Sequence, residues 1–247
     1  MSSRRFISAG ALPLLAVLST TAQAAVVCNG GLVGPICTLA GPNVNWVFDV
    51  NTQNSAGLLF GAPSLLGDAV RFIPSAFIAD AVQGAGATST TAFFVFDRVY
   101  TNSGGGIVGF TAVEQGDYFI TNGASVSASL YTQTSTNNGA FPFDFNNTTQ
   151  NFSANVPVAT TVWNLSSFLT TAPFAGPKND VTFGIQNTLQ ALGTTCPAPP
   201  ASCPAAEAFI QKKFNIDVVA IPVPAAVWLF GSGLGGLLSM ARRRRTG

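Results

Sequence analysis

The chain has 247 residues, a formal net charge of +1 and 9% charged residues, far below the roughly 25% of an average soluble protein. Six of the eleven basic residues lie in the two terminal segments, so residues 25–220 hold five basic and ten acidic side chains, a net charge of −5. This balance excludes the basic stripe of a nucleic-acid-binding protein, and the absence of histidine excludes Ser-His-Asp catalysis and histidine-ligated metal sites.

Residues 1–24 have the three parts of a secretory signal peptide. Arg4 and Arg5 form the positive start, residues 6–18 are apolar, and Ala22 and Ala24 form a small-residue cleavage site. The apolar stretch is too short to span a hydrocarbon core of roughly 30 Å. The sequence therefore predicts export and cleavage after Ala24, which leaves one body domain at residues 25–220.

Four cysteines form two close pairs, Cys28 with Cys37 and Cys196 with Cys203. An even number of cysteines in an exported chain indicates disulfides, and three connectivities are possible. We predict the local pairing, with Cα separations of roughly 4.4–6.8 Å. A Cys₄ zinc site is the competing interpretation, but its usual spacing of roughly two to four intervening residues is shorter than either spacing here.

Alternating apolar and polar residues predict strands in the body, with turn residues between them. The predicted strands lie at 44–50, 69–78, 91–100, 106–113, 143–145, 156–164, 181–191 and 214–218. Asn122-Gly123 lies between two β-rich runs and predicts a type I′ hairpin, because both central residues of that turn need positive φ. Surface loops are expected at 103–106 and 132–139, and a rigid proline-rich excursion at 197–204.

These short strands, with 20 phenylalanines and no sustained helical pattern, predict an all-β fold. The expected architecture is an antiparallel two-sheet sandwich of the jelly-roll or immunoglobulin-like kind. A barrel built from the same strands is the alternative. The full prediction adds a cleaved signal helix before this domain and a single transmembrane helix after it.

Two patterns in the body could carry catalytic or metal-binding chemistry. Glu114 and Asp117 lie in a turn-like run and are the closest pair of acids for glycosidase-type catalysis, although acids at turns are usually solvated. Asp49-Val-Asn51 resembles the start of a calcium loop, but the sixth position is not glycine and the twelfth is Phe60, which excludes an EF-hand and leaves only a looser calcium site.

Other residues suggest contact with sugars. Trp46, Trp163 and Tyr131 could stack on polysaccharide, although aromatic residues in alternating strands are more often core. Glycosylation sequons at Asn146, Asn147, Asn151 and Asn164 mark 146–153 as polar and exposed.

The C-terminal segment gives the most specific signal. No residue from 218 to 241 is charged, and Arg242, Arg243, Arg244 and Arg245 follow at once. A transmembrane helix over about residues 225–241 is short but able to cross, and the arginines place its end in the cytoplasm. The predicted topology therefore has the body outside and the tail inside.

The segment 221–245 resembles the PEP-CTERM sorting domain, in the subgroup with a Val-Pro-x-Pro-Ala-Ala-Val-Trp-Leu-Phe-Gly-Ser-Gly core. The residues that carry the resemblance are Pro222, Val223, Pro224, Ala225, Trp228, Gly231, Gly233, Arg242, Arg243, Arg244 and Arg245. Val223 stands where the family's name has glutamate. The resemblance implies recognition by exosortase, an integral-membrane cysteine transpeptidase, in a Gram-negative bacterium that makes extracellular polysaccharide.

These features predict a non-enzymatic protein of the cell surface or extracellular matrix, held transiently in the inner membrane by residues 221–247 and then processed. Its expected partners are an exosortase-type transpeptidase, the inner membrane and extracellular polysaccharide, with no nucleic acid, cofactor or metal. A carbohydrate-binding module is the alternative function. A polysaccharide hydrolase that uses two carboxylates is the third hypothesis.

Overall fold

The computed structural model describes residues 26–29, 36–51, 57–74, 76–81, 86–121, 123–136, 144–176, 178–193 and 206–222. Across these residues it is an all-β protein with two antiparallel sheets. The elements are β1 (Val26–Asn29), β2 (Ile36–Ala40), β3 (Val44–Asp49), a 3₁₀ turn (Gly57–Phe60), β4 (Ser64–Leu66), β5 (Ala69–Phe72), β6 (Ile78–Ala81), β7 (Ala87–Thr101), β8 (Ile107–Ile120), β9 (Ser125–Thr136), β10 (Phe145–Ala154), β11 (Val158–Thr170), β12 (Asp180–Leu192) and β13 (Ala208–Pro222).

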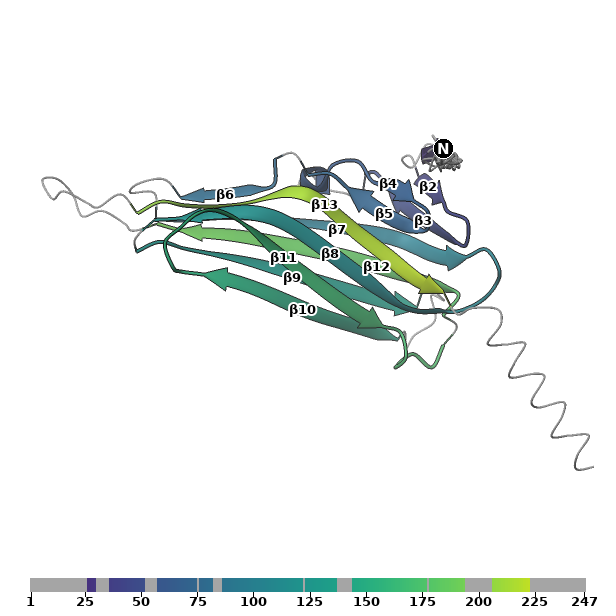
Figure 1. The fold of residues 1–247 in the computed structure, drawn as a ribbon. Helices are drawn as coiled ribbons and strands as arrows, with labels where there is room; N and C mark the ends of the chain where they lie inside the picture. Colours follow the sequence, from purple (N-terminus) through teal and green to yellow (C-terminus); the bar gives the residue numbers. More distant parts are fainter. Residues whose placement is uncertain are drawn as a thin grey trace, which may run out of the picture.

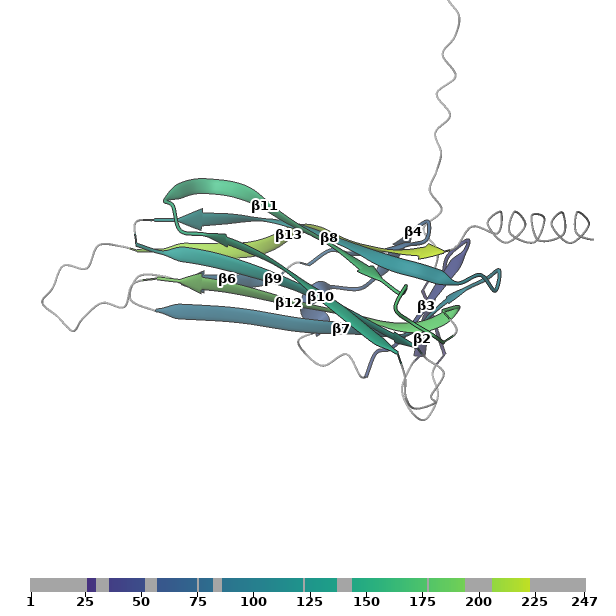
Figure 2. The ribbon, with the colours of Figure 1, turned by 90° about the horizontal axis from the view of Figure 1, so that it is seen from below.

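The strands divide into two layers. Sheet A has the order β1-β2-β3-β7-β12-β9-β10, and sheet B has the order β11-β8-β13-β5-β4, with β6 also paired to β13. The long strands β7–β13 run along the length of the body (Figure 1). Seen from below, β11, β8 and β13 form one layer and β7, β12 and β9 the other (Figure 2). The predicted two-sheet, all-β architecture is confirmed at this level.

From β7 onward the chain changes sheets at almost every connection. Strands β7, β9, β10 and β12 belong to sheet A, and β8, β11 and β13 belong to sheet B. Only β9 and β10 are consecutive strands of this series that pair with each other. Each other connection therefore passes from one layer to the other.

This topology corrects the predicted hairpin. The strands on either side of Asn122-Gly123 are β8 and β9, which lie in different sheets and do not pair. Gly123 has the expected positive φ of 80°, but the backbone bonds nearby belong to an arch: Thr121 N donates to Glu207 O at 2.8 Å and Ala124 N donates to Thr121 O at 3.2 Å. The Asn-Gly pattern favours a local backbone conformation but does not determine which strands pair.

A cluster of aromatic rings fills the space between the sheets. Trp46 is fully buried and lies 4.9 Å from Phe96, measured between ring centroids. Phe110 of sheet B stacks on Phe183 of sheet A at 4.4 Å, and Phe72 meets Phe94 across the same gap at 4.9 Å. Burying such side chains contributes roughly 1.5–3 kcal/mol each relative to exposure, so the phenylalanine-rich composition supplies the main stabilising term.

Several strand predictions hold and others need correction. Strands 91–100 and 181–191 are confirmed as β7 and β12, while the predicted strand 69–78 is divided into β5 and β6 around Pro74, which cannot donate to a ladder. Phe145 was expected on the core face but is 49% exposed, because β10 is the edge strand of sheet A. Phe143 lies outside the described residues.

The predicted surface loop at 132–139 is wrong for its first half. Residues 132–136 complete β9, and Thr132, Thr134 and Thr136 are buried on its inner face. Thr132 and Ser167 join the two sheets through a hydroxyl–hydroxyl bond of 3.1 Å. Threonine is favoured in strands, so this threonine-rich run forms a strand whose buried face is polar.

One of the two predicted disulfides lies among the described residues. Cys28 of β1 is directly opposite Cys37 of β2, and the two are bridged. The predicted local pairing is confirmed, but their Cα atoms are 4.0 Å apart, below the predicted range of roughly 4.4–6.8 Å. Facing residues of adjacent antiparallel strands approach to about 4.5 Å, which favours the short end of that range. Cys196, Cys203 and the proline-rich segment 197–204 lie outside the described residues.

Candidate functional site

The two tryptophans proposed as sugar-stacking residues are core residues. Trp46 is 0% exposed and its indole N–H donates to Asp68 O at 3.1 Å, and Trp163 is 2% exposed and donates to Gln211 O at 3.2 Å. Tyr131 is half-buried in β9, with its hydroxyl donating to Gln133 Oε1 at 3.1 Å. These three residues therefore form no shared exposed aromatic surface.

Glu114 and Asp117 lie within β8, so the prediction that they occupy a turn is wrong. Both are buried, with 0% and 6% exposure. Their spacing of three residues in a strand of continuous register places the two side chains on opposite faces of sheet B. The pair therefore does not converge on one cleft.

Glu114 instead belongs to a buried polar cluster that we define as Glu114, Lys212 and Asn187. Lys212 Nζ is in direct ionic contact with Glu114 Oε2, and neither side chain is exposed to solvent. Asn187, on β12 of the opposite sheet, is also 0% exposed. Alternate residues of a strand face the same side, and each of the three polar residues is two positions from a buried apolar residue of its strand. Glu114 follows Ala112, Lys212 follows Ile210, and Asn187 lies between Ile185 and Leu189.

Aromatic rings surround the ammonium end of Lys212. Its Nζ lies 5.2 Å from the centroid of Trp163 and 5.4 Å from that of Phe77. Phe152 covers Trp163 in a stacked arrangement, with centroids 5.8 Å apart. Ring faces attract cations and also exclude water, so the charge of the cluster lies in an apolar surrounding.

Burial controls the ionisation of the pair. Desolvation raises the pKa of Glu114 above its ordinary value, and the nearby Lys212 and the Asn187 amide only partly offset this effect. Desolvation also lowers the pKa of Lys212, with Glu114 acting in the opposite direction. Both shifts favour the neutral carboxyl and the neutral amine, because a low-dielectric interior disfavours the charged forms.

Three polar atoms of the cluster are buried without a hydrogen bond. They are Glu114 Oε1 and both the oxygen and the nitrogen of the Asn187 side-chain amide. The amide is close enough to lower the pKa of Glu114 but is not in hydrogen-bonding geometry with it. An unsatisfied buried polar group costs about 1–3 kcal/mol, so this cluster is an exception that calls for a physical explanation.

The residues of the suspected calcium loop make a local turn. Asn51 N donates to Asp49 Oδ1 at 2.8 Å, and Asp49 N donates to Asp97 Oδ2 at 2.9 Å. Desolvation raises the pKa of Asp97, the hydrogen bond from Asp49 N partly offsets this rise, and the negative charge of Asp49 adds a smaller increase. Within the described residues, no three acidic, cysteine or histidine side chains gather as a metal site.

The sequon-rich segment is an exposed edge strand. Asn146, Asn147 and Asn151 lie on β10, where Asn147 and Asn151 are exposed and Asn146 Nδ2 donates to Thr170 O at 2.8 Å. Asn164 is exposed on β11. The prediction that 146–153 is polar and exposed holds for five of its eight residues, whereas Asn146, Thr148 and Phe152 are half-buried and the segment is a regular strand.

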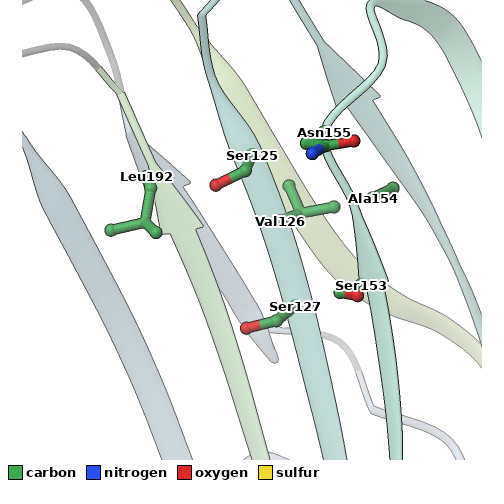
Figure 3. Close-up of a pocket in the computed structure, with 7 residues that line it drawn as sticks. All are labelled: Ser125, Val126, Ser127, Ser153, Ala154, Asn155 and Leu192. Carbon is green, nitrogen blue, oxygen red and sulfur yellow. The ribbon is translucent and has the colours of Figure 1, made fainter.

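A shallow pocket of about 350 Å³ opens between the ends of β9, β10 and β12 (Figure 3). Serine hydroxyls, Val126 and Leu192 line it together with the backbone turn at Asn155. None of its lining side chains is charged or aromatic. Its chemistry is therefore limited to neutral hydrogen bonding, and it brings none of the predicted site residues together.

Pro222 alone among the predicted sorting-motif residues lies in the described part, where it ends β13 opposite Ile107. Residues 1–25 and 223–247 lie outside it, and so do the predicted signal peptide, transmembrane helix and arginine tail. No helix long and apolar enough to cross a bilayer occurs in the ranges that the structure describes.

Sequence reasoning overlooked Lys212 and Asn187. Each could have been found by following the inward row of its strand, since a lysine two residues after Ile210 and an asparagine between Ile185 and Leu189 break an otherwise apolar face. Glu114 was predicted to be a solvated acid, but it lies two residues after the buried Ala112 and faces the core with it.

Comparison with known proteins finds no family model that matches this chain and no curated protein that matches it.

Proposed function

We propose that this chain is an exported protein of the cell surface or extracellular matrix, sorted through residues 221–247 and structural or adhesive in role. The observation that carries the proposal is the segment 221–245, in which a Pro-x-Pro pair, an apolar stretch and four arginines follow one another. The proposal includes a cleaved signal peptide at 1–24 and a transmembrane helix at about 225–241. It also includes the jelly-roll or immunoglobulin-like assignment of the two sheets.

Each part of the proposed tag has a physical role. The apolar stretch partitions into the bilayer, and the arginine quartet resists transfer across it, so export stops with the body outside. Prolines at 222 and 224 favour an extended approach that an exosortase-type transpeptidase could bind. Cleavage near Pro222–Pro224 would then release the body to the outer surface and its polysaccharide.

Two features of the described body support this role. The Cys28–Cys37 bridge is a form of stabilisation that persists in oxidising compartments outside the cytoplasm. Strand β13 ends at Pro222, so the proposed cleavage site directly follows the fold. A transpeptidase could therefore cut there and leave every described strand in place, with at most the last residue of β13 removed.

The test is mass spectrometry of the protein recovered from its native host. The surface species should begin at Ala25 and end near residues 222–224. A variant that stops at Pro222 serves as the control, and it should be secreted without passing through a membrane-bound form. Recovery of mature surface protein that retains Arg242–Arg245 would refute processing at the tag.

A second variant separates membrane retention from recognition. Replacing the four arginines with serine should leave the helix without its cytoplasmic anchor and reduce the membrane-bound precursor, while a Trp228→Ala change should leave the precursor in the membrane but slow its conversion. If both variants are processed like the wild-type chain, residues 221–247 do not direct sorting.

A further inference from the structure

The cluster of Glu114, Lys212 and Asn187 assembles three different functional groups from three strands. Glu114 comes from β8 and Lys212 from β13, neighbouring strands of sheet B, and Asn187 comes from β12 of sheet A. Strands β12 and β13 approach each other across the core. An amine, a carboxyl and a primary amide therefore meet inside the protein, with 3%, 0% and 0% exposure of their residues.

The arrangement places the carboxyl next to both other groups. Lys212 Nζ contacts one oxygen of Glu114, and the Asn187 side chain lies near enough to the same carboxyl to make a small, lowering contribution to its pKa. The second oxygen of Glu114 and the whole amide of Asn187 lack hydrogen bonds. A purely structural ion pair would be expected to satisfy these atoms, because a half-satisfied buried network is less stable than an apolar core.

Burial also shifts both groups toward their reactive forms. Burial lowers the pKa of Lys212, which favours the neutral amine, the form with a free electron pair. Burial raises the pKa of Glu114, which favours the protonated acid, the form able to polarise a carbonyl oxygen. The rings of Trp163 and Phe77 shield the amine from water that would compete as a nucleophile.

We propose that Lys212 and Asn187 form an intramolecular amide bond that covalently joins β13 to β12, with Glu114 as the general acid and base. The neutral Nζ attacks Cγ of Asn187 while Glu114 donates a hydrogen bond to the amide oxygen. The resulting tetrahedral centre transfers one proton from Nζ, through the carboxyl of Glu114, to the amide nitrogen. The Cγ–Nδ2 bond then breaks, ammonia leaves, and Glu114 returns to its starting state.

Atoms and electrons balance without any further reagent, since one amine and one primary amide give one secondary amide and one ammonia molecule. The reaction happens once per chain and removes a titratable amine from the core. Its product is a covalent link between two sheets whose described residues are otherwise joined by side-chain packing and by hydrogen bonds such as that of Thr132 with Ser167. The inference rests on the described core alone and does not depend on the proposed sorting function.

The test is peptide mapping of the full-length chain after reduction of its disulfides. In an unlinked chain, combined cleavage after lysine and glutamate should separate fragment 179–207, which contains Asn187, from fragment 208–212, which ends at Lys212. Acylation of Lys212 blocks cleavage after it, so in the linked protein the second fragment is 208–213. The proposal predicts one branched peptide that holds both fragments and is lighter than their sum by one ammonia. Tandem fragmentation should locate the branch at Lys212 and Asn187, which distinguishes it from ammonia loss at an Asn-Gly sequence.

Three variants test the roles of the groups. Lys212→Met and Asn187→Ala remove a reacting atom and should abolish the branched peptide, while Glu114→Gln keeps the shape but cannot carry the proton and should reduce it at least tenfold. Asn164→Ala, at an exposed asparagine, is the matched control and should leave it unchanged. Because core variants could fail to fold, the wild-type map is decisive by itself.

The proposal is overturned if wild-type protein with a β-sheet circular dichroism spectrum and a cooperative unfolding transition yields only separate 179–207 and 208–212 fragments. A folded Glu114→Gln protein with the wild-type amount of branched peptide overturns the assigned role of Glu114. Neither result bears on processing near residue 222, so a failure here is distinguishable from a failure of the proposed sorting function.

Discussion

Replacing Asp68 with alanine is expected to destabilise the protein by about 3 kcal/mol. Asp68 lies in the turn between β4 and β5 of sheet B and accepts hydrogen bonds from the start of β3 in sheet A: from Asn43 N at 2.8 Å, Asn43 Nδ2 at 2.8 Å and Val44 N at 3.1 Å. Its carboxylate therefore ties the two sheets at this end of the body.

The magnitude follows from what each lost bond leaves behind. The two bonds from Asn43 are exposed, so water replaces the carboxylate and each loss costs about 0.5–1.5 kcal/mol. The N–H of Val44 belongs to a residue with 0% exposure, and leaving it unsatisfied costs about 1–3 kcal/mol. The sum is roughly 2–6 kcal/mol, and the expected loss of about 3 kcal/mol corresponds to a fall in Tm of about 6–12 °C.

Urea unfolding followed by tryptophan fluorescence measures this change, because Trp46 and Trp163 are buried and their emission shifts on exposure. Asp68→Asn is the matched variant, since its amide oxygen can still accept from both backbone N–H groups, and it should cost about 1 kcal/mol. Asp80→Ala, at an exposed position, should stay within about 0.5 kcal/mol of wild type. The assigned role of Asp68 is refuted if Asp68→Ala lowers the free energy of unfolding no more than Asp80→Ala does. It is also refuted if Asp68→Asn lowers it as much as Asp68→Ala.

Three further predictions concern other parts of the fold. Gly116→Ala should destabilise by about 3 kcal/mol or more, because a Cβ there would lie 1.9 Å from a backbone carbonyl oxygen of β13; a urea midpoint equal to that of wild type would contradict the described pairing. The double change Cys28→Ser, Cys37→Ser should cost about 2–3 kcal/mol under oxidising conditions, measured by thermal unfolding, and an unchanged Tm would show that the bridge adds no stability. Because desolvation raises the pKa of Asp97, the folded protein takes up a proton there at a higher pH than the unfolded chain. Stability relative to Asp97→Asn should therefore rise as the pH falls from 7 towards the ordinary carboxyl pKa of about 3.9, and a difference that is constant with pH would oppose this account.

Local strand signals were the most reliable part of the sequence prediction. The alternation at 44–50 placed Trp46 and Phe48 in the core, and the β-rich runs at 91–100 and 181–191 are central strands. A period of two reports which side chains share a face, and that information is contained in a few neighbouring residues. The all-β class and the two layers follow from it directly.

The alternation of apolar and polar residues does not predict which strands pair. Asn122-Gly123 predicted a hairpin, but the chain passes there from sheet B to sheet A, because β8 pairs with β11 and β13. Those partners are chosen by packing between strands that are distant in the sequence. Thr132 and Thr134 were assigned to a loop for a related reason, since a threonine-rich strand and a polar loop have similar compositions.

The polar cluster shows a different limit of sequence reasoning. Asp117 and Glu114 were judged as a pair because they are close in sequence, yet a strand directs them to opposite faces. Lys212 is 98 residues from Glu114, and only the fold shows that they meet. Chemistry that depends on such contacts becomes visible once the sheet order is known.

The position of β13 in sheet B also determines when during synthesis this sheet can be completed. This strand lies between β8 and β5, and its Asp217 forms an ion pair with Arg71, which was synthesised 146 residues earlier. Sheet B therefore has a gap at its centre until the chain has been made as far as residue 222. At roughly 5–20 residues per second, the strands made first wait about 7–30 seconds for this partner. Until then, β8 and β5 lack the strand that joins them, so sheet B is the part of the body that is completed last.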